Sequence, residues 1–294
     1  MSDLSNTPII GIDRGASFTD FAVIESDSLV ETLSVEKRDW KSIEKAFDRL
    51  IERYQTDQIV FTGSTADMPA KIKKEVQMVP EIDAIGFGGS ALANYTDCIV
   101  VSIGTGTAIV HFSENSARHV GGTGLGGGTI KGLSSIICGL DDPLQIEARA
   151  VKGNPSKINL TISDLGYEGL SFLDADMTAS NFADIKSNKP EDMAAGILRL
   201  VGETVGIIAS ICAREFKCQN RIVVVGKVAN SQFIRHIIDL VGKLYQTQFT
   251  FPENPGYASV YGAVVKYSYD RMAENRNGEF GMRNGERENG KENG

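Results

Sequence analysis

The sequence predicts an α/β protein with two related domains, and three observations support this prediction. Short apolar segments rich in β-branched residues alternate with amphipathic segments of helical period. A strand, a glycine-containing turn and a second strand occur at 9–26 and again at 98–112, which indicates a duplicated domain. The 294 residues are 41% hydrophobic, and a chain of this size buries a core large enough to be divided between two domains.

The first domain is predicted over residues 9–95, after a short lead at 1–8. It opens with a hairpin, in which the strand IIGID, the turn RGAS and the strand FTDFAVIES follow one another. A helix is expected over 40–54, where apolar side chains recur at spacings of three and four. The segment QIVFTG at 58–63 then predicts a buried strand that ends in glycine.

The second domain is predicted over 96–272. Its hairpin, CIVVSIGTGTAIVHF, is followed by a glycine-dense loop that opens into a helix over 129–138. The later elements are a long helix, a buried strand, an amphipathic helix, a short strand and a closing helix, at 191–217, 221–226, 230–245, 249–251 and 256–271. Residues 273–294 have almost no apolar side chains and repeat Asn-Gly, so they predict a disordered tail.

Composition narrows the classes of partner. The 30 Lys and Arg against 38 Asp and Glu give a net charge of −8, which disfavours nucleic acid. The longest apolar run, at 205–213, is too short for a membrane span, which needs about 20 residues. The N-terminus lacks a basic region followed by an apolar run, so we expect a cytoplasmic protein. The four cysteines have no CxxC spacing and fit reduced thiols: Cys98, Cys138, Cys212 and Cys218.

Three glycine-rich turns, at 13–17, 104–107 and 121–128, are the main functional signal. Each follows or closes an apolar strand, where backbone N–H groups can surround an anion because glycine has no Cβ to keep it away. One such turn alone also fits a hairpin that needs positive φ. Three together favour a phosphate site.

Asp13 ends the first strand, beside the first turn. A carboxylate held there can orient the water ligands of Mg²⁺ next to a polyphosphate. The alternative is that Asp13 only caps its own turn through an Asx hydrogen bond.

Several segments together resemble the type II pantothenate kinases of the actin, sugar-kinase and heat-shock ATPase superfamily. GIDRGAS, VPEIDAIGFG, VSIGTGTAIVHF and HVGGTGLGGGTIKGL are each similar to a motif of that family, and the resemblance covers about residues 9–267. The last two segments as a pair are the specific part. The resemblance implies two duplicated actin-like, ribonuclease H-like domains that flank an ATP cleft.

The resemblance also implies roles for individual residues. Glu81 would be the general base and Asp13 the carboxylate linked to Mg²⁺ through water. The other residues that would bind ATP are Arg14, Gly15, Ala16, Ser17, Thr105, Gly106, Thr107, Gly127, Gly128, Thr129, Ile130, Lys131, Gly226 and Lys227. Those that would bind the substrate with Glu81 are Ser102, Arg118, His119 and Gly121.

This sequence departs from the family pattern at three places. Ala16 replaces a glycine, and Asp20 replaces a lysine, which should weaken ATP binding unless the Asp20 side chain faces away. The family's arginine before VGG is His119 here, and the arginine stands one residue earlier, at Arg118. One residue of shift turns a strand side chain to the other face, so either His119 has taken the role or a bulge restores Arg118.

The resemblance predicts ATP-dependent phosphorylation of pantothenate to 4'-phosphopantothenate, the first step of coenzyme A biosynthesis. It also implies a homodimer that pairs through the long helix at 191–217. Two alternatives stay open. GASFTD is also similar to the opening of the much longer hydantoinase and oxoprolinase subunits, and the three departures also fit a nucleotide-binding sensor without catalysis.

Overall fold

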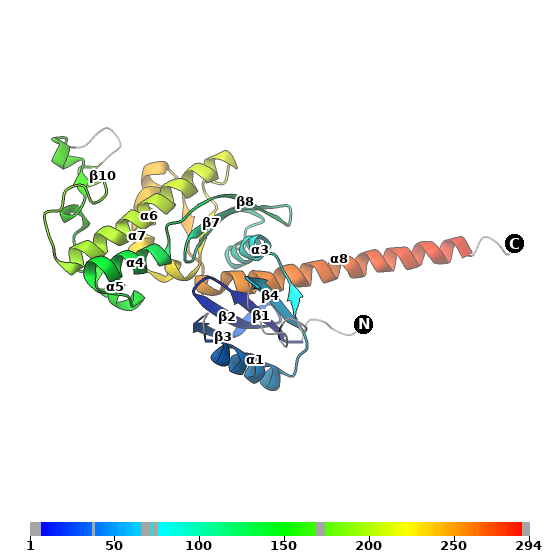
Figure 1. Cartoon of the computed structure of the whole chain (residues 1–294). Helices are drawn as coiled ribbons and strands as arrows, with labels where there is room; N and C mark the ends of the chain where they lie inside the picture. The colour runs from blue at the N-terminus through cyan, green and yellow to red at the C-terminus, as the bar shows by residue number, and fades with distance from the viewer. Residues whose placement is uncertain (1–6, 37–38, 66–71, 73–75, 169–173, 290–294) are drawn as a thin grey trace.

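The chain forms two five-stranded sheets with helices between and outside them (Figure 1). The computed structural model describes residues 7–36, 39–65, 72, 76–168 and 174–289, with the backbone alone over 276–289. The strand order is β3-β2-β1-β4-β5 in the first sheet and β12-β11-β6-β7-β8 in the second.

The two sheets have the same topology. In the first, β1 (Ile9–Arg14) pairs antiparallel with β2 (Phe18–Glu25) and parallel with β4 (Ile59–Gly63). In the second, β6 (Asp97–Ile103) pairs antiparallel with β7 (Thr107–Ser113) and parallel with β11 (Ile222–Val225). The outer strands also correspond: β3 (Ser28–Glu36) to β8 (Ser116–Thr123), and β5 (Gln77–Met78) to β12 (Phe249–Thr250). The predicted duplicated α/β architecture is therefore confirmed.

Two glycines mark the equivalent strand ends. Gly63 closes β4 with φ +89° and Gly226 follows β11 with φ +90°. A Cβ on Gly63 would lie 2.5 Å from Arg14 O, and one on Gly226 2.5 Å from Ile103 O. Each central strand thus ends against a glycine that no other residue can replace without strain.

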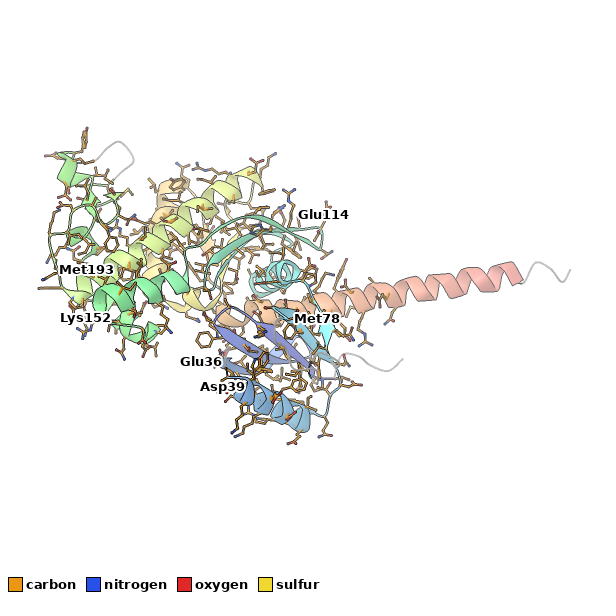
Figure 2. All side chains as sticks on the ribbon, viewed as in Figure 1. Glu36, Asp39, Met78, Glu114, Lys152 and Met193 are labelled. Atoms are coloured by element: carbon orange, nitrogen blue, oxygen red, sulfur yellow. The ribbon has the colours of Figure 1, made fainter. Side chains whose placement is uncertain are left out.

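A helix, α1 (Trp40–Tyr54), covers the outer face of the first sheet. It buries Ile43, Phe47 and Leu50 against that face, as its period predicts. Asp39, labelled in Figure 2 below the end of β3, caps it by accepting from Ser42 N at 3.0 Å.

Over the outer face of the second sheet lie the helices α4 (Gly127–Cys138), α5 (Pro143–Ala150), α6 (Pro190–Glu215) and α7 (Gln232–Tyr245). Of these, α6 and α7 contact its strands, and the other two pack against α6. Among the described residues, α6 is the helix long and apolar enough for a membrane span by length and composition. Its apolar side chains, Val201, Val205 and Ala209 among them, are buried in the core of the second domain, so α6 is a core helix.

Short elements complete the chain. β9 (Leu160–Thr161) and β10 (Thr178–Ser180) form a small separate sheet against α6, where Thr178 Oγ1 donates to Glu203 Oε1 at 2.9 Å. The 3₁₀ turns are η2 (Pro155–Lys157), η3 (Ser163–Leu165), η4 (Lys227–Asn230) and η5 (Pro255–Tyr257). The sequence patterns did not predict the small sheet, because its strands are too short for a period.

The helices α3 (Glu81–Ala93) and α8 (Ala258–Asn289) cross between the two sheets. One side of the pair packs on the first sheet through Ala84, Val260 and Val264. The other side packs on the second sheet through Ile85 and Phe87. The predicted domain boundary at 95 falls just after α3, and each of the two helices contacts both sheets.

The end of α8 differs from the expected disordered tail. The helix continues to Asn289 and projects away from the body (Figure 1), while 290–294 lie outside the described residues. A polar segment alone cannot nucleate a helix, but this segment extends a helix whose first turns are fixed by packing, so it needs no nucleus of its own.

Candidate functional site

Two of the predicted turns face one another across the two domains. The β1–β2 turn and the β6–β7 turn lie at the same ends of their sheets, and Ser17 Oγ is 2.9 Å from Thr105 Oγ1. Within the described part of the chain, no hydrogen bond uses the backbone N–H groups of Ala16, Ser17, Thr105 and Gly106. The two turns therefore offer a set of donors to an anion placed beside them.

The third glycine segment supports the second turn. Gly127 N donates to Gly104 O at 2.8 Å, and Gly128 N donates to Thr105 O at 2.9 Å. A Cβ on Gly126 would lie 2.7 Å from Thr105 O, so that position requires glycine. We predicted that Gly127 and Gly128 bind ATP, and in the structure their N–H groups hold the second turn.

The neighbours of these glycines differ in exposure. Thr107 is buried and its Oγ1 donates to Leu125 O at 2.7 Å, so it supports the loop. Thr129 Oγ1 donates to Gly124 O at 3.2 Å, and Ile130 is buried in the core. Lys131, the fifth residue of α4, is exposed.

Carboxylates cluster beside the turns. Asp13 of β1 and Asp20 of β2 are register partners, so both face α3 and α8, and Glu81 begins α3. Burial, then the charges of Asp20 and Glu81, raise the pKa of Asp13 to about 7, while the charge of Lys227 opposes this shift. Hard carboxylate oxygens with an unfavourable mutual charge fit Mg²⁺, which would relieve it.

Lys227 joins this cluster from the other domain. Its Nζ lies 2.7 Å from Asp20 Oδ1 and 3.8 Å from the centre of the Phe18 ring, and it donates to Ser34 Oγ. From the sequence we expected Asp20 to weaken ATP binding unless its side chain faced away. Asp20 does face the site, and a cation supplied by Lys227 neutralises it.

Arg14 does not point into the site. Its guanidinium carbon lies 4.4 Å from the centre of the Trp40 ring, and Nη1 donates to Ser64 O at 3.3 Å. Alternation along β1 places this side chain on the α1 face, opposite Asp13. We predicted Arg14 as an ATP ligand. In the structure its side chain points away from the site, so only its backbone could bind ATP.

A bulge in β8 settles which way Arg118 and His119 face. His119 pairs with Val110 and Gly121 pairs with Ile109, so Val120 is the extra residue. Val110 belongs to the core beneath α3, and His119 therefore lies on the side where Glu81 begins. Arg118 lies on the α6 side, 5.1 Å from the centre of the Phe216 ring. The bulge follows His119, so it does not bring Arg118 to the α3 side.

Two other predicted substrate residues separate in the same way. Ser102 lies on the same strand face as Cys98 and Val100, toward α3 and α8. Gly121 faces α6, where an added Cβ would be 3.1 Å from Cys212 Sγ. The structure brings Ser102 and His119 to the side of Glu81, and it leaves Arg118 and Gly121 on the opposite face.

One side chain beside the cluster escaped sequence reasoning. Thr62 of β4 pairs in register with Asp13 and shares its face. Its hydroxyl is fully buried and has no hydrogen-bond partner among the described residues. The available signal was its place just before Gly63, at the end of the strand parallel to β1.

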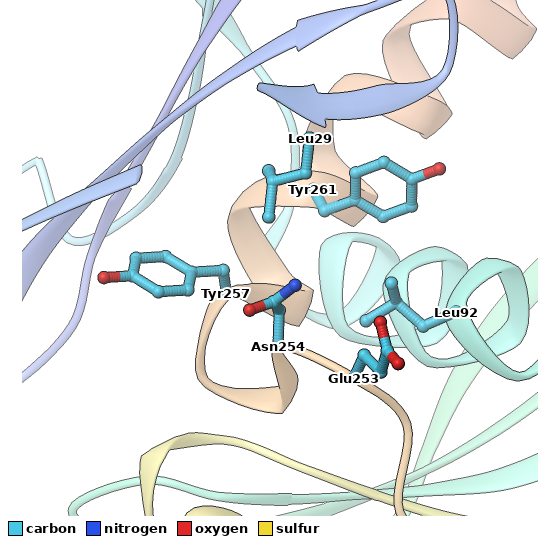
Figure 3. Close-up of a pocket in the computed structure, with 6 residues that line it drawn as sticks. All are labelled: Leu29, Leu92, Glu253, Asn254, Tyr257 and Tyr261. Atoms are coloured by element: carbon cyan, nitrogen blue, oxygen red, sulfur yellow. The ribbon is translucent and has the colours of Figure 1, made fainter. Parts of the chain in front are cut away.

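Two hollows lie away from the turns. One of about 320 Å³ lies between β3, α3 and the start of α8, where Figure 3 shows Asn254 between Leu92 and the two tyrosines. Its lining residues are Leu29, Leu92, Glu253, Asn254, Tyr257 and Tyr261. The other, of about 550 Å³, lies between β8 and the end of α6, and its lining includes Arg118, His119 and Phe216. Asp13, Asp20 and Glu81 line neither hollow.

The duplicated sheets, the facing turns and the central helix pair define the actin-like class of two-domain ATPase folds. The chain belongs to the Fumble family, whose profile matches residues 68–266. It is 27% identical over 272 residues to type II pantothenate kinases of Staphylococcus aureus strains RF122 and USA300, covering 87% of this chain and 98% of each relative.

Solved structures share the fold at lower identity. The activator of 2-hydroxyisocaproyl-CoA dehydratase from Clostridium difficile, with bound ADPNP, is 16% identical at a TM-score of 0.60, covering 92% of this chain and 97% of its own. Component A of (R)-2-hydroxyglutaryl-CoA dehydratase from Acidaminococcus fermentans is 15% identical at 0.64, covering 91% and 100%. A ROK family glucokinase from Streptomyces griseus, with glucose and AMPPNP, is 14% identical at 0.51, covering 87% and 97%.

Proposed function

We propose that the protein is an ATP-dependent kinase that phosphorylates pantothenate to 4'-phosphopantothenate, the first step of coenzyme A biosynthesis. The observation that carries the proposal is the meeting of two glycine turns beside Asp13 and Glu81. The likeness to type II pantothenate kinases supports the acceptor. The nucleotide analogues in two structural neighbours support the donor.

Each group at the site has its own role in the proposed phosphoryl transfer. The N–H groups of the two turns bind the β and γ phosphates and hold the γ phosphate for transfer. Asp13 would hold Mg²⁺ through water, and the metal when bound would shield the phosphate charge. Glu81 accepts the proton of the primary hydroxyl as that oxygen attacks the γ phosphorus, while the bond from the γ phosphorus to the bridging oxygen breaks and ADP leaves. His119 and Ser102, on the same side, orient the acceptor.

The first experiment supplies purified protein with MgATP and pantothenate and measures both ADP and phosphopantothenate by mass spectrometry. Equal amounts of the two products support the proposal. ADP without phosphopantothenate indicates an ATPase with another acceptor or with water. Nucleotide binding without ADP indicates a sensor. Either of these results contradicts the proposed kinase.

We also propose that the protein is cytoplasmic and forms a homodimer. The sequence analysis placed the dimer contact on the long helix, and α6 keeps Ile211 exposed at 56% while most of its apolar side chains face the core. Ile136 and Leu144, on α4 and α5, are also exposed, at 84% and 80%, but they lie near the start of α6, at the other end of that helix from Ile211. Light scattering that gives the 31.8 kDa monomer mass at micromolar concentration would contradict the dimer.

A further inference from the structure

The contact between Asp20 and Lys227 joins the two domains at the cleft. Asp20 belongs to β2 of the first sheet, and Lys227 begins η4 directly after β11 of the second. Of the ion pairs formed by the described residues, this is the one that links a strand of the first sheet to the second domain.

The Lys227 side chain is held on three sides. Asp20 accepts from its ammonium, Ser34 accepts from it as well, and the Phe18 ring lies beneath it. Ser34 Oγ also donates to the same Asp20 oxygen at 2.6 Å. Such an arrangement restricts a long side chain that would otherwise sample many rotamers, so its charge has a defined position.

The charges around Lys227 indicate what its fixed ammonium group can do. Asp13, Asp20 and Glu81 are three carboxylates within electrostatic reach of one another, and Lys227 is the cation that acts on Asp13. A triphosphate approaching this cluster meets repulsion unless a cation is present. The turns contribute dipoles, whereas Lys227 contributes a full charge.

We propose that Lys227 contacts the nucleotide phosphates and that Asp20 is the residue that positions it, so that the second domain supplies the phosphate cation to the first. This inference rests on the proposed function for the nature of the anion. Asp20 would then favour nucleotide binding by positioning Lys227, although its negative charge alone would oppose an anion.

The two partners then have unequal effects. Lys227→Met removes the cation and leaves Asp20 unpaired beside the phosphates, so affinity falls through both changes. Asp20→Asn removes the holder but leaves the cation free to reach the anion, so its effect is smaller. The double variant removes the cation and the unpaired carboxylate together, so it binds better than Lys227→Met alone.

The experiment measures the Kd of AMPPNP with Mg²⁺ by calorimetry for the wild type and these variants, with no acceptor present. We expect Lys227→Met to weaken binding about tenfold or more, Asp20→Asn to weaken it less, and the double variant to regain part of the loss. Lys227→Arg keeps the positive charge, so it should keep most of the affinity. A purely structural role of the pair would not require this result.

Lys266→Met is the matched control. Lys266 pairs with Asp270 and lies 5.6 Å from the centre of the Phe87 ring, so it has the same kind of partners on α8. We expect no change in Kd for this variant, with thermal unfolding to verify that every variant folds.

Three results bear against the inference. Wild-type affinity in Lys227→Met overturns it while leaving the proposed function intact. So does a double variant that binds no better than Lys227→Met. Absence of AMPPNP binding by the wild-type protein instead contradicts the nucleotide donor, and with it the proposed function. Asp20→Asn serves as the independent arm if Lys227→Met fails to fold.

Discussion

Gly88 of α3 and Gly262 of α8 lie against each other at the crossing of the two central helices. A Cβ built on Gly262 would be 2.6 Å from Gly88 Cα, and one built on Gly88 would be 3.3 Å from Gly262 Cα. The helix backbones therefore approach more closely than any side chain permits. Since this crossing lies between the two sheets, it fixes how the domains meet.

Gly262→Ala should accordingly destabilise the protein. The added methyl group must push the helices apart, which costs about 1–3 kcal/mol in a packed interior. The control is Gly132→Ala in α4, where an added Cβ meets nothing within 4 Å and Gly-to-Ala replacement favours a helix. Thermal unfolding should show a lower Tm for the first variant and an equal or higher Tm for the second. Equal Tm values for both would contradict the close crossing.

Changing Glu81 to Gln should remove most turnover and leave nucleotide affinity intact. Proton removal is needed for transfer and not for binding, so kcat should fall about 10²-fold or more while the Kd of AMPPNP holds. Asp83→Asn, two residues further along the same helix, is the matched control and should keep kcat. Wild-type turnover in Glu81→Gln would exclude Glu81 as the base.

Asp13 predicts an unusual dependence of stability on pH. Its pKa is raised from 3.8 to about 7 in the folded state, so folding favours the protonated carboxyl. The stabilisation is complete below about pH 4 and is lost as the pH rises toward 7. The Tm of Asp13→Asn should exceed that of the wild type at pH 8 and match it near pH 4. A constant difference across this range would show that Asp13 is not the titrating group.

The same carboxyl predicts a pH-dependent effect of the metal. Mg²⁺ should raise the Tm of the wild type at pH 8, where Asp13 is ionised, and have little effect at pH 5. In Asp13→Asn the metal should have little effect at either pH. An equal Mg²⁺ effect in both proteins would place the ion elsewhere.

The bulge at Val120 predicts which of two neighbouring side chains, Arg118 or His119, serves the acceptor. His119→Ala should lower kcat/KM for pantothenate with little change in the KM of ATP, since His119 faces α3 and Glu81. Arg118→Ala should have a small effect, because Arg118 lies over Phe216 on the opposite face. If Arg118→Ala abolishes activity while His119→Ala retains it, the assignment by strand face is wrong.

Local patterns were sufficient for the two hairpins, for β4 and β11 and for α1, α6 and α7, because periodicity and glycine turns are properties of neighbouring residues. They did not predict β3 or α3. They were insufficient for the pairing of Asp20 with Lys227, which lie far apart in the chain and share no spacing rule. They could not decide on which face of the sheet His119 lies, because one extra residue in the pairing of β7 with β8 sets that face. They did not predict that α8 continues to Asn289, because the polar end of this helix extends a part whose first turns are fixed by packing.

The near symmetry of the two sheets also constrains the direction of a bound polyphosphate. Asp13 stands one residue before the end of β1, and Ser102 stands at the matching place on β6. A chain of phosphates lying between two similar turns has two possible directions, and matching carboxylates would not distinguish them. If Asp13 holds Mg²⁺ as proposed, a carboxylate at one turn and a hydroxyl at the other would give the metal a single place, and this pair of unlike residues would set the direction of the ligand.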